Sequence, residues 1–253
     1  MRGQPQHIEC FQLVLLRVLE SRLDRGLWAV KGGVNLRAWF GSLRYSEDMD
    51  IDVFRSSSHA LREKIDRLLS SSTLRDMLRG QGLEIGRSSR PKQTETTQRW
   101  KLELRAEGLS LPLHTRIEFS RRGSSEEYRL EPVRADIVRP YGLSAPTVNH
   151  YSARSAVRQK IEALAGRREP QARDVWDLEH LIRTTGADGS PFTPRERETL
   201  ARALERAVSL PFDRYASQVV PYLSPEHQEI FRAPDAWDRI RELVVDRLSE
   251  HAE

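Results

Sequence analysis

The spacing of hydrophobic residues changes near residue 150 and predicts two parts of different character. In the first part, residues 6–24 carry apolar side chains at helical spacing, and 34–40 and 58–79 repeat that pattern. A short apolar segment lies at 27–30, strand-like segments lie at 44–54, 83–86, 99–106 and 111–120, and 127–138 adds a further candidate strand. The polar residues 87–98 between two of these strands are typical of a mobile loop.

Beyond residue 150 the helical period dominates. Residues 152–166, 171–184, 193–208 and 235–252 have it, and Pro- and Gly-containing breaks separate them. The chain therefore predicts an α+β protein, with a mixed α/β domain at 1–140 and a helical domain at 141–253.

The amino-acid composition excludes several classes of protein. The 253 residues are 38% hydrophobic, which is enough for a core, and no stretch approaches the roughly 20 apolar residues of a membrane span. The N-terminus lacks the pattern of a signal peptide, so we expect a cytoplasmic protein with no membrane partner. A single cysteine, Cys10, excludes an internal disulfide and any zinc site built from several cysteines.

Charge is distributed unevenly. Residues 1–150 hold 25 Lys and Arg against 19 Asp and Glu, and 151–253 hold 16 against 18. Of the 41 basic residues, 36 are arginine, whose planar guanidinium suits phosphate groups. The basic first half is compatible with a nucleotide or nucleic-acid partner, and a genome that favours Arg codons explains it equally well.

The segment RYSEDMDIDVF at 44–54 carries the most specific pattern. In a strand, Met49, Ile51 and Val53 share one face and Asp48, Asp50 and Asp52 the other. Three like charges on one short strand repel each other, and a divalent cation is an economical way to compensate them. Magnesium takes one or two protein carboxylates together with phosphate oxygens. The alternative is an exposed strand whose acidic face is solvated.

A second motif, VKGGVNL at 30–36, precedes the acidic strand. Gly32 and Gly33 at the start of a helix allow backbone N–H groups to approach phosphate oxygens, and Lys31 adds a positive charge. For the pair of glycines alone, an ordinary turn is the more common explanation. With the aspartates one helix away, it predicts one nucleotide that spans both motifs.

Together these motifs resemble those of the nucleotidyltransferase superfamily of the DNA polymerase β type, and KGGVNL followed by RYSEDMDIDVF is closely similar to the AbiEii/AbiGii toxin family. The resemblance implies a polymerase β-like core followed by a helical domain that completes the active site. It also implies a third carboxylate on a later strand. Glu118 in LHTRIEFS lies on the polar face there and would be a third metal ligand or the base for the attacking hydroxyl. Without the resemblance, the simpler interpretation of a surface glutamate paired with Arg116 is equally good.

The helical part contains a further match. ARSAVRQKIEALAGR followed by ARDVWDLEHLI is similar to the family's C-terminal motif, which implies that Lys160 contacts nucleotide phosphates and Asp174 shapes the site. Arg173 and Asp177 would brace it. Without the resemblance, Arg173 and Asp177 are an ordinary i,i+4 pair, and Lys160 is a surface lysine.

The resemblance thus implies a catalytic set and a nucleotide-binding set. Asp48, Asp50 and Glu118 would hold Mg²⁺ or Mn²⁺, with Asp52 as the substitute ligand if the register is shifted. The expected catalytic residues are Asp48, Asp50, Glu118, Lys160 and Asp174. The expected nucleotide-binding residues are Lys31, Gly32, Gly33, Arg44, Ser46 and Lys160.

The implied function is that of a toxin of a toxin–antitoxin system, known from abortive infection. It would transfer an NMP from an NTP to an RNA, the 3′ end of tRNA, and so block translation. The partners are then NTP, tRNA and a cognate antitoxin that need not form a stable complex. Two other functions stay open: transfer to a small molecule or a protein side chain, and a non-catalytic Arg-rich RNA-binding module.

Overall fold

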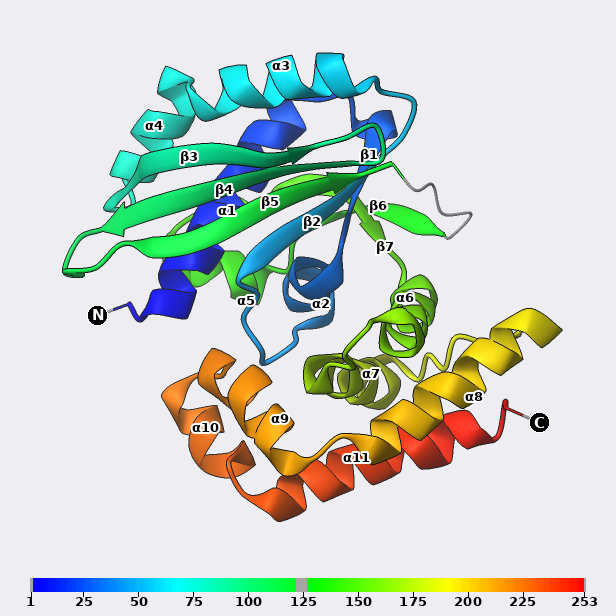
Figure 1. The fold of residues 1–253 in the computed structure, drawn as a ribbon. Helices are drawn as coiled ribbons and strands as arrows, with labels where there is room; N and C mark the ends of the chain where they lie inside the picture. The colour runs from blue at the N-terminus through cyan, green and yellow to red at the C-terminus, as the bar shows by residue number, and fades with distance from the viewer. Residues whose placement is uncertain (1, 122–126, 253) are drawn as a thin grey trace. The chain divides into compact units, whose positions relative to one another are not determined.

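The computed structural model describes residues 2–121 and 127–252 and divides the chain into two compact units (Figure 1). Unit 1 comprises residues 1–41 and 45–151, and unit 2 comprises residues 42–44 and 152–253. The sequence places the boundary at residue 140, whereas the structure keeps the strand Thr147–Tyr151 in unit 1. The segment 42–44 belongs to unit 2 although the chain on either side of it belongs to unit 1.

A seven-stranded mixed sheet forms the framework of unit 1. Its spatial order is β3-β4-β5-β2-β1-β7-β6, with β2 parallel to β5 and β1 parallel to β7. The strands are β1 (Trp28–Lys31), β2 (Asp48–Val53), β3 (Leu83–Gln93), β4 (Thr97–Ala106), β5 (Leu113–Ser120), β6 (Tyr128–Pro132) and β7 (Thr147–Tyr151). The predicted α+β fold class is confirmed.

Three helices, α1 (Gln4–Arg22), α3 (Ser58–Leu69) and α4 (Ser72–Arg79), cover one face of this sheet (Figure 1). Their apolar side chains share one core with the inward-facing residues of the strands, among them Trp100 and Phe119, whose rings meet edge to face. The sequence predicts a single helix over 58–79, but it breaks at Ser70. Ser71 caps a new helix there by accepting a hydrogen bond from the backbone N–H of Leu74.

The predicted loop at 87–98 is wrong, because most of it belongs to a long β-hairpin. β3 continues to Gln93 and β4 begins at Thr97, with irregularities in the pairing after Ile85 and after Ser89. β3 is an edge strand, so its side chains need no apolar alternation and Pro91 is tolerated in it.

Shorter elements connect the strands. The 3-10 turn η1 (Arg25–Leu27) leads into β1, and α2 (Gly32–Phe40) follows β1 directly. The candidate strand at 127–138 is shorter than predicted, because β6 ends at Pro132 and α5 (Ala135–Val138) and η2 (Arg139–Tyr141) follow.

Unit 2 is built from helices around its own apolar core. Its elements are α6 (Ala153–Gly166), α7 (Ala172–Thr185), α8 (Pro194–Ser209), α9 (Phe212–Gln218), η3 (Val220–Tyr222), α10 (Pro225–Phe231) and α11 (Pro234–Ser249). Tyr215 of α9 stacks on Trp237 of α11 with ring centroids 4.9 Å apart. The hydrophobic pattern predicts the four long helices and misses α9 and α10, whose seven residues are too few for a clear period.

Across residues 2–121 and 127–252, none of the helices has the length and apolar character that crossing a membrane requires.

Candidate active site

Strand pairing places the predicted acidic residues side by side on the sheet face opposite the helix-covered core. In the parallel pair β2–β5, Asp50 lies directly beside Glu118, and in the antiparallel pair β1–β2 it lies beside Lys31. Neighbouring strands are about 4.8 Å apart, so these side chains leave the sheet as close neighbours. Met49 and Ile51 point the other way and are fully buried in the core. The alternation predicted for the acidic strand is therefore present, although β2 begins only at Asp48.

Gly32 joins the phosphate-binding motif to the acidic strand. It is the first residue of α2, its φ is +68°, and a Cβ at this position would lie 2.9 Å from Oδ2 of Asp50. Both the left-handed backbone and this close approach require glycine. The side chain of the N-cap residue, Lys31, cannot accept a hydrogen bond. The start of α2 is therefore a site with backbone donors and helix-dipole charge directly beside a carboxylate.

Arginines compensate two of the carboxylates. Nε of Arg116 lies 3.0 Å from Oδ2 of Asp48, and Nη2 of Arg99 lies 2.5 Å from Oε2 of Glu118. The simpler interpretation of Glu118, a pair with its neighbour Arg116, is wrong because Arg116 pairs across the strands with Asp48. All four side chains keep between 22% and 35% of their surface exposed, so these ion pairs are worth only about 0–1 kcal/mol each.

Asp52 differs from the other two aspartates of β2 because it is buried. Its Oδ1 lies 2.5 Å from Nζ of Lys31, and its Oδ2 accepts a hydrogen bond of 2.8 Å from the hydroxyl of Tyr151. Both oxygens are engaged within unit 1, so Asp52 is suited to fixing the position of Lys31.

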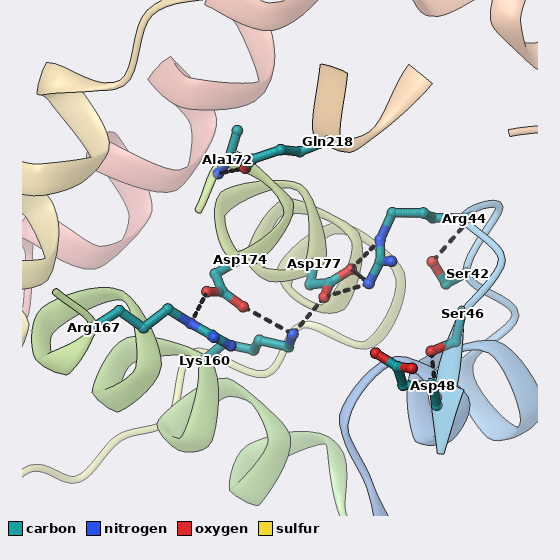
Figure 2. Close-up of polar contacts among 10 residues, drawn as sticks. All are labelled: Ser42, Arg44, Ser46, Asp48, Lys160, Arg167, Ala172, Asp174, Asp177 and Gln218. Atoms are coloured by element: carbon teal, nitrogen blue, oxygen red, sulfur yellow. Dashed lines mark hydrogen bonds and ion pairs between the residues drawn. The ribbon is translucent and has the colours of Figure 1, made fainter. Parts of the chain in front are cut away.

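Ser46 and Arg44 lie before β2 rather than in it. The hydroxyl of Ser46 donates to the backbone carbonyl of Asp48, which fixes the start of the strand (Figure 2). Arg44 belongs to unit 2 and is only 6% exposed. The predicted alternation over 44–54 therefore holds only from Asp48 onward.

Unit 2 contains a buried cluster of charges at α6 and α7 (Figure 2). Nζ of Lys160 lies 3.0 Å from Asp174 Oδ1 and 2.5 Å from Asp177 Oδ2, and both carboxylates are fully buried. Arg44 donates to both oxygens of Asp177 at 2.9 and 3.1 Å, and Nε of Arg167 donates to Asp174 at 3.0 Å. The main cationic partners of Asp177 are thus Arg44 and Lys160, in place of the predicted neighbour Arg173.

The protonation of Asp177 follows from these partners. Burial raises the pKa of its carboxyl group, but the charges of Arg44 and Lys160 and their hydrogen bonds outweigh burial and hold the pKa at about 2. Three cations, Arg44, Lys160 and Arg167, surround the two carboxylates, so the cluster carries a net positive charge when both are ionised. A net cationic cluster is suited to an anion such as phosphate.

The carboxylates of unit 1 fit a magnesium or manganese ion. Within residues 2–121 and 127–252, no three His, Cys, Asp or Glu side chains already form a metal site. Magnesium does not need one, since it binds through one or two carboxylates and takes its other ligands from phosphate and water. Asp48 supplies hard oxygen donors that are partly exposed, and its ion pair with Arg116 is weak enough for a metal cation to replace the arginine.

Two residues of unit 1 are absent from the sequence-based prediction: Arg99 pairs with Glu118, and Tyr151 donates a hydrogen bond to Asp52. In unit 2 the prediction includes Arg44 as a nucleotide-binding residue but not its pairing with Asp177, which lies 133 residues later in the sequence. Alternation on β4 places Arg99 on the polar face, which was an available signal. Sequence spacing carries no signal for the other two contacts.

Comparisons with known proteins agree with this architecture. Residues 14–250 match the family model described as nucleotidyl transferase AbiEii toxin, type IV toxin–antitoxin system. MenT4, a nucleotidyltransferase toxin from Mycobacterium tuberculosis, has a similar structure, with a TM-score of 0.66 and 20% identity over 100% of this chain and 86% of that one. JHP933 from Helicobacter pylori gives a TM-score of 0.60 and 15% identity over 100% of this chain and 96% of that one. Curated protein sequences give no significant match.

At these identities the two structures support the fold, while the family match covers nearly the whole chain and carries the activity. The predicted membership and the predicted nucleotidyltransferase activity are both confirmed. The chain belongs to the AbiEii family of nucleotidyl transferase toxins of type IV toxin–antitoxin systems.

Proposed function

We propose that this toxin transfers an NMP from an NTP to an RNA acceptor, with the 3′ end of tRNA as the target, and thereby blocks translation. The observation that carries the proposal is the neighbourhood of Asp50. The strand register places Asp50 between Lys31 and Glu118, and its carboxylate lies against Gly32 at the start of α2. Phosphate-binding groups and carboxylates therefore meet at one point of one sheet face.

Each part has a chemical role in this reaction. The backbone N–H groups at the start of α2 and the ammonium of Lys31 bind the triphosphate. Asp48 and Asp50 would hold a magnesium ion, which when bound neutralises charge on the phosphates. Glu118 is the base of the proposal. In the free protein Glu118 is paired with Arg99, and this weak ion pair must open before the carboxylate can accept a proton.

The reaction is an in-line displacement at the α-phosphorus. A hydroxyl of the acceptor forms the new P–O bond, its proton passes to the Glu118 carboxylate, and the bond to the bridging oxygen breaks to release pyrophosphate. For Lys160 and Asp174 the proposal rests on the family resemblance and on charges within unit 2 alone: Lys160 binds a phosphate, and the two buried aspartates fix its position.

The charge of the first half of the chain agrees with an RNA acceptor. Residues 1–150 carry a net charge of +6, from 25 Lys and Arg against 19 Asp and Glu, which favours a polyanion over a neutral small molecule. A cognate antitoxin is the expected partner of a toxin of this family, with or without a stable complex.

The test is incubation with each α-labelled NTP, Mg²⁺ and total tRNA, followed by separation of RNA, protein and small molecules. Asp50→Asn should lose transfer by at least about a hundredfold with little change in melting temperature, since its side chain lies on the polar face. Asp76→Asn, an exposed position on α4, is the matched control and should behave as wild type. Label on protein or a small molecule with unlabelled RNA would refute the RNA acceptor.

A further inference from the structure

The face of β3, β4 and β5 that carries Glu118 is rich in cations. Because paired residues share a face, the register assigns to it Arg87, Lys92, Arg99, Lys101, Arg105 and Arg116, against three acids, Glu84, Glu103 and Glu118. The opposite face holds the buried residues Trp100, Leu102 and Leu104. The cations are therefore gathered on one face of the sheet rather than scattered at random.

This face is open to solvent and hollowed beside the acidic strand. Arg87, Lys101 and Arg105 are exposed. A hollow of about 560 Å³ lies over the strands, and its lining includes Asp48, Arg87, Lys101 and His114. One of the expected metal ligands, Asp48, thus lies at the border of the cationic surface.

The order of strands relates this surface to the reaction. In one row across the sheet, Lys31 on β1 is followed by Asp50 on β2, Glu118 on β5, Arg99 on β4 and Lys92 on β3. Gly32 and the start of α2 lie at the β1 end of this row. An in-line displacement needs the attacking and leaving oxygens on opposite sides of the phosphorus. With the triphosphate at the β1 end, the acceptor arrives from the β5–β4–β3 side.

We propose that the exposed face of β3, β4 and β5 is the surface on which a single-stranded end of the RNA acceptor lies, bound through its phosphates. The inference rests on the proposed RNA acceptor. On β4, Lys101 and Arg99 lie about 7 Å apart along the strand and lead to Glu118, and Arg105 lies beyond Glu103 on the same face.

The composition of this face also defines how the RNA is recognised. Sheets that read bases present exposed aromatic rings for stacking. The face-sharing residues of β3, β4 and β5, all of which the structure describes, include no Phe, Tyr or Trp, and His114 supplies their single aromatic ring. Binding on this surface should therefore depend strongly on salt and little on base sequence.

The experiment measures RNA affinity separately from transfer. Fluorescence anisotropy of labelled 12-nucleotide oligo(A) and oligo(U) is followed with Asp50→Asn protein, so that no reaction occurs. Into this background we place either Arg87→Glu with Lys101→Glu, or Arg75→Glu with Arg79→Glu. The second pair makes the same charge change on α4, which packs against the other face of the sheet.

Arg87→Glu/Lys101→Glu should weaken binding of both oligonucleotides by about tenfold or more. It should also lower the slope of log K against log salt by about 1.4, because each phosphate that a cation neutralises on a single strand contributes about 0.7 to that slope. The α4 pair should weaken binding far less. If the two double substitutions give equal RNA affinities, the proposal that this face binds RNA is wrong. A tenfold preference for one oligonucleotide overturns recognition by phosphates alone.

Transfer by the protein with native Asp50 is assayed in parallel on total tRNA. Failure of the wild type to label RNA refutes the RNA acceptor of the proposed function, and the anisotropy comparison still decides whether this face binds single strands. If the wild type labels RNA, the proposed function is supported. If Arg87→Glu/Lys101→Glu then leaves the Michaelis constant for RNA unchanged, the proposed acceptor surface is wrong.

Discussion

Replacing Gly32 with alanine should damage catalysis far more than stability, and a second glycine provides the comparison. Gly32 has φ of +68°, and a Cβ there would lie 2.9 Å from the Asp50 carboxylate. Gly142, which ends η2 in the same unit, has φ of +64°, and a Cβ there would meet none of the described residues within 4 Å. The two positions share the backbone strain and differ only in the neighbour.

The magnitudes follow from this close approach. An alanine in the left-handed region costs about 1–2 kcal/mol, and we expect that loss of unfolding free energy in both variants. Ordinary contacts begin at 3.4 Å, so in Gly32→Ala the Asp50 oxygen must retreat by about 0.5 Å. A misplacement approaching 1 Å at a reacting centre costs up to about a hundredfold in rate, so we expect a tenfold to hundredfold loss of transfer.

Urea unfolding measures the first quantity, and pyrophosphate release at saturating NTP measures the second. Gly142→Ala should lose the same stability and keep its turnover. If Gly32→Ala retains the turnover of Gly142→Ala at similar stability, the close approach of Gly32 to Asp50 has no catalytic importance and the reasoning fails.

Three further predictions concern buried charges. The Asp177 pKa is about 2 in the folded protein against an ordinary 3.8, so its carboxylate contributes about 2 kcal/mol above pH 4 and loses that contribution as pH falls through 2. Asp177→Asn should therefore unfold in urea with a smaller difference between pH 6 and pH 3, and an unchanged difference would contradict this cause. Arg44→Lys loses the two-point hydrogen bonding to Asp177 and should cost about 1–3 kcal/mol, visible as a lower melting temperature; an unchanged one would argue against that pairing. Tyr151→Phe removes the hydrogen bond to Asp52, and the loosened Asp52–Lys31 pair should raise the Michaelis constant for NTP several-fold, whereas an unaltered constant would contradict the positioning of Lys31 by the Tyr151–Asp52 contact.

The sequence-based prediction was most accurate in strands whose alternating apolar residues enter the core. The polar and apolar faces around Asp50 and Glu118 follow from alternation, because Met49 and Ile117 must enter the core. The sequence cannot predict that β2 and β5 are neighbours, since residues 54–112, which include two other strands, separate them. The family resemblance supplied that expectation, and the observed register supports it.

Edge strands and long-range pairs were the least predictable features. β3 lies at an edge with both faces largely exposed, so the stretch around Pro91 has the composition of a loop. Spacing on a helix suggested Arg173 as the partner of Asp177. The structure places Arg44 there instead, because a fully buried carboxylate needs close cationic partners, and only tertiary folding can bring a residue 133 positions away in sequence into that environment.

The membership of residues 42–44 in unit 2 has a consequence for how this toxin can be divided and made. Arg44 leaves the ribosome 133 residues before the carboxylate that it will neutralise. A fragment that begins at Ser152 would contain Asp177 but lack the guanidinium of Arg44, although Lys160 would remain. A fragment of the helical half alone therefore has a buried carboxylate with one of its two main cationic partners missing, and a nascent chain stopped before α7 lacks the anionic half of this ion pair.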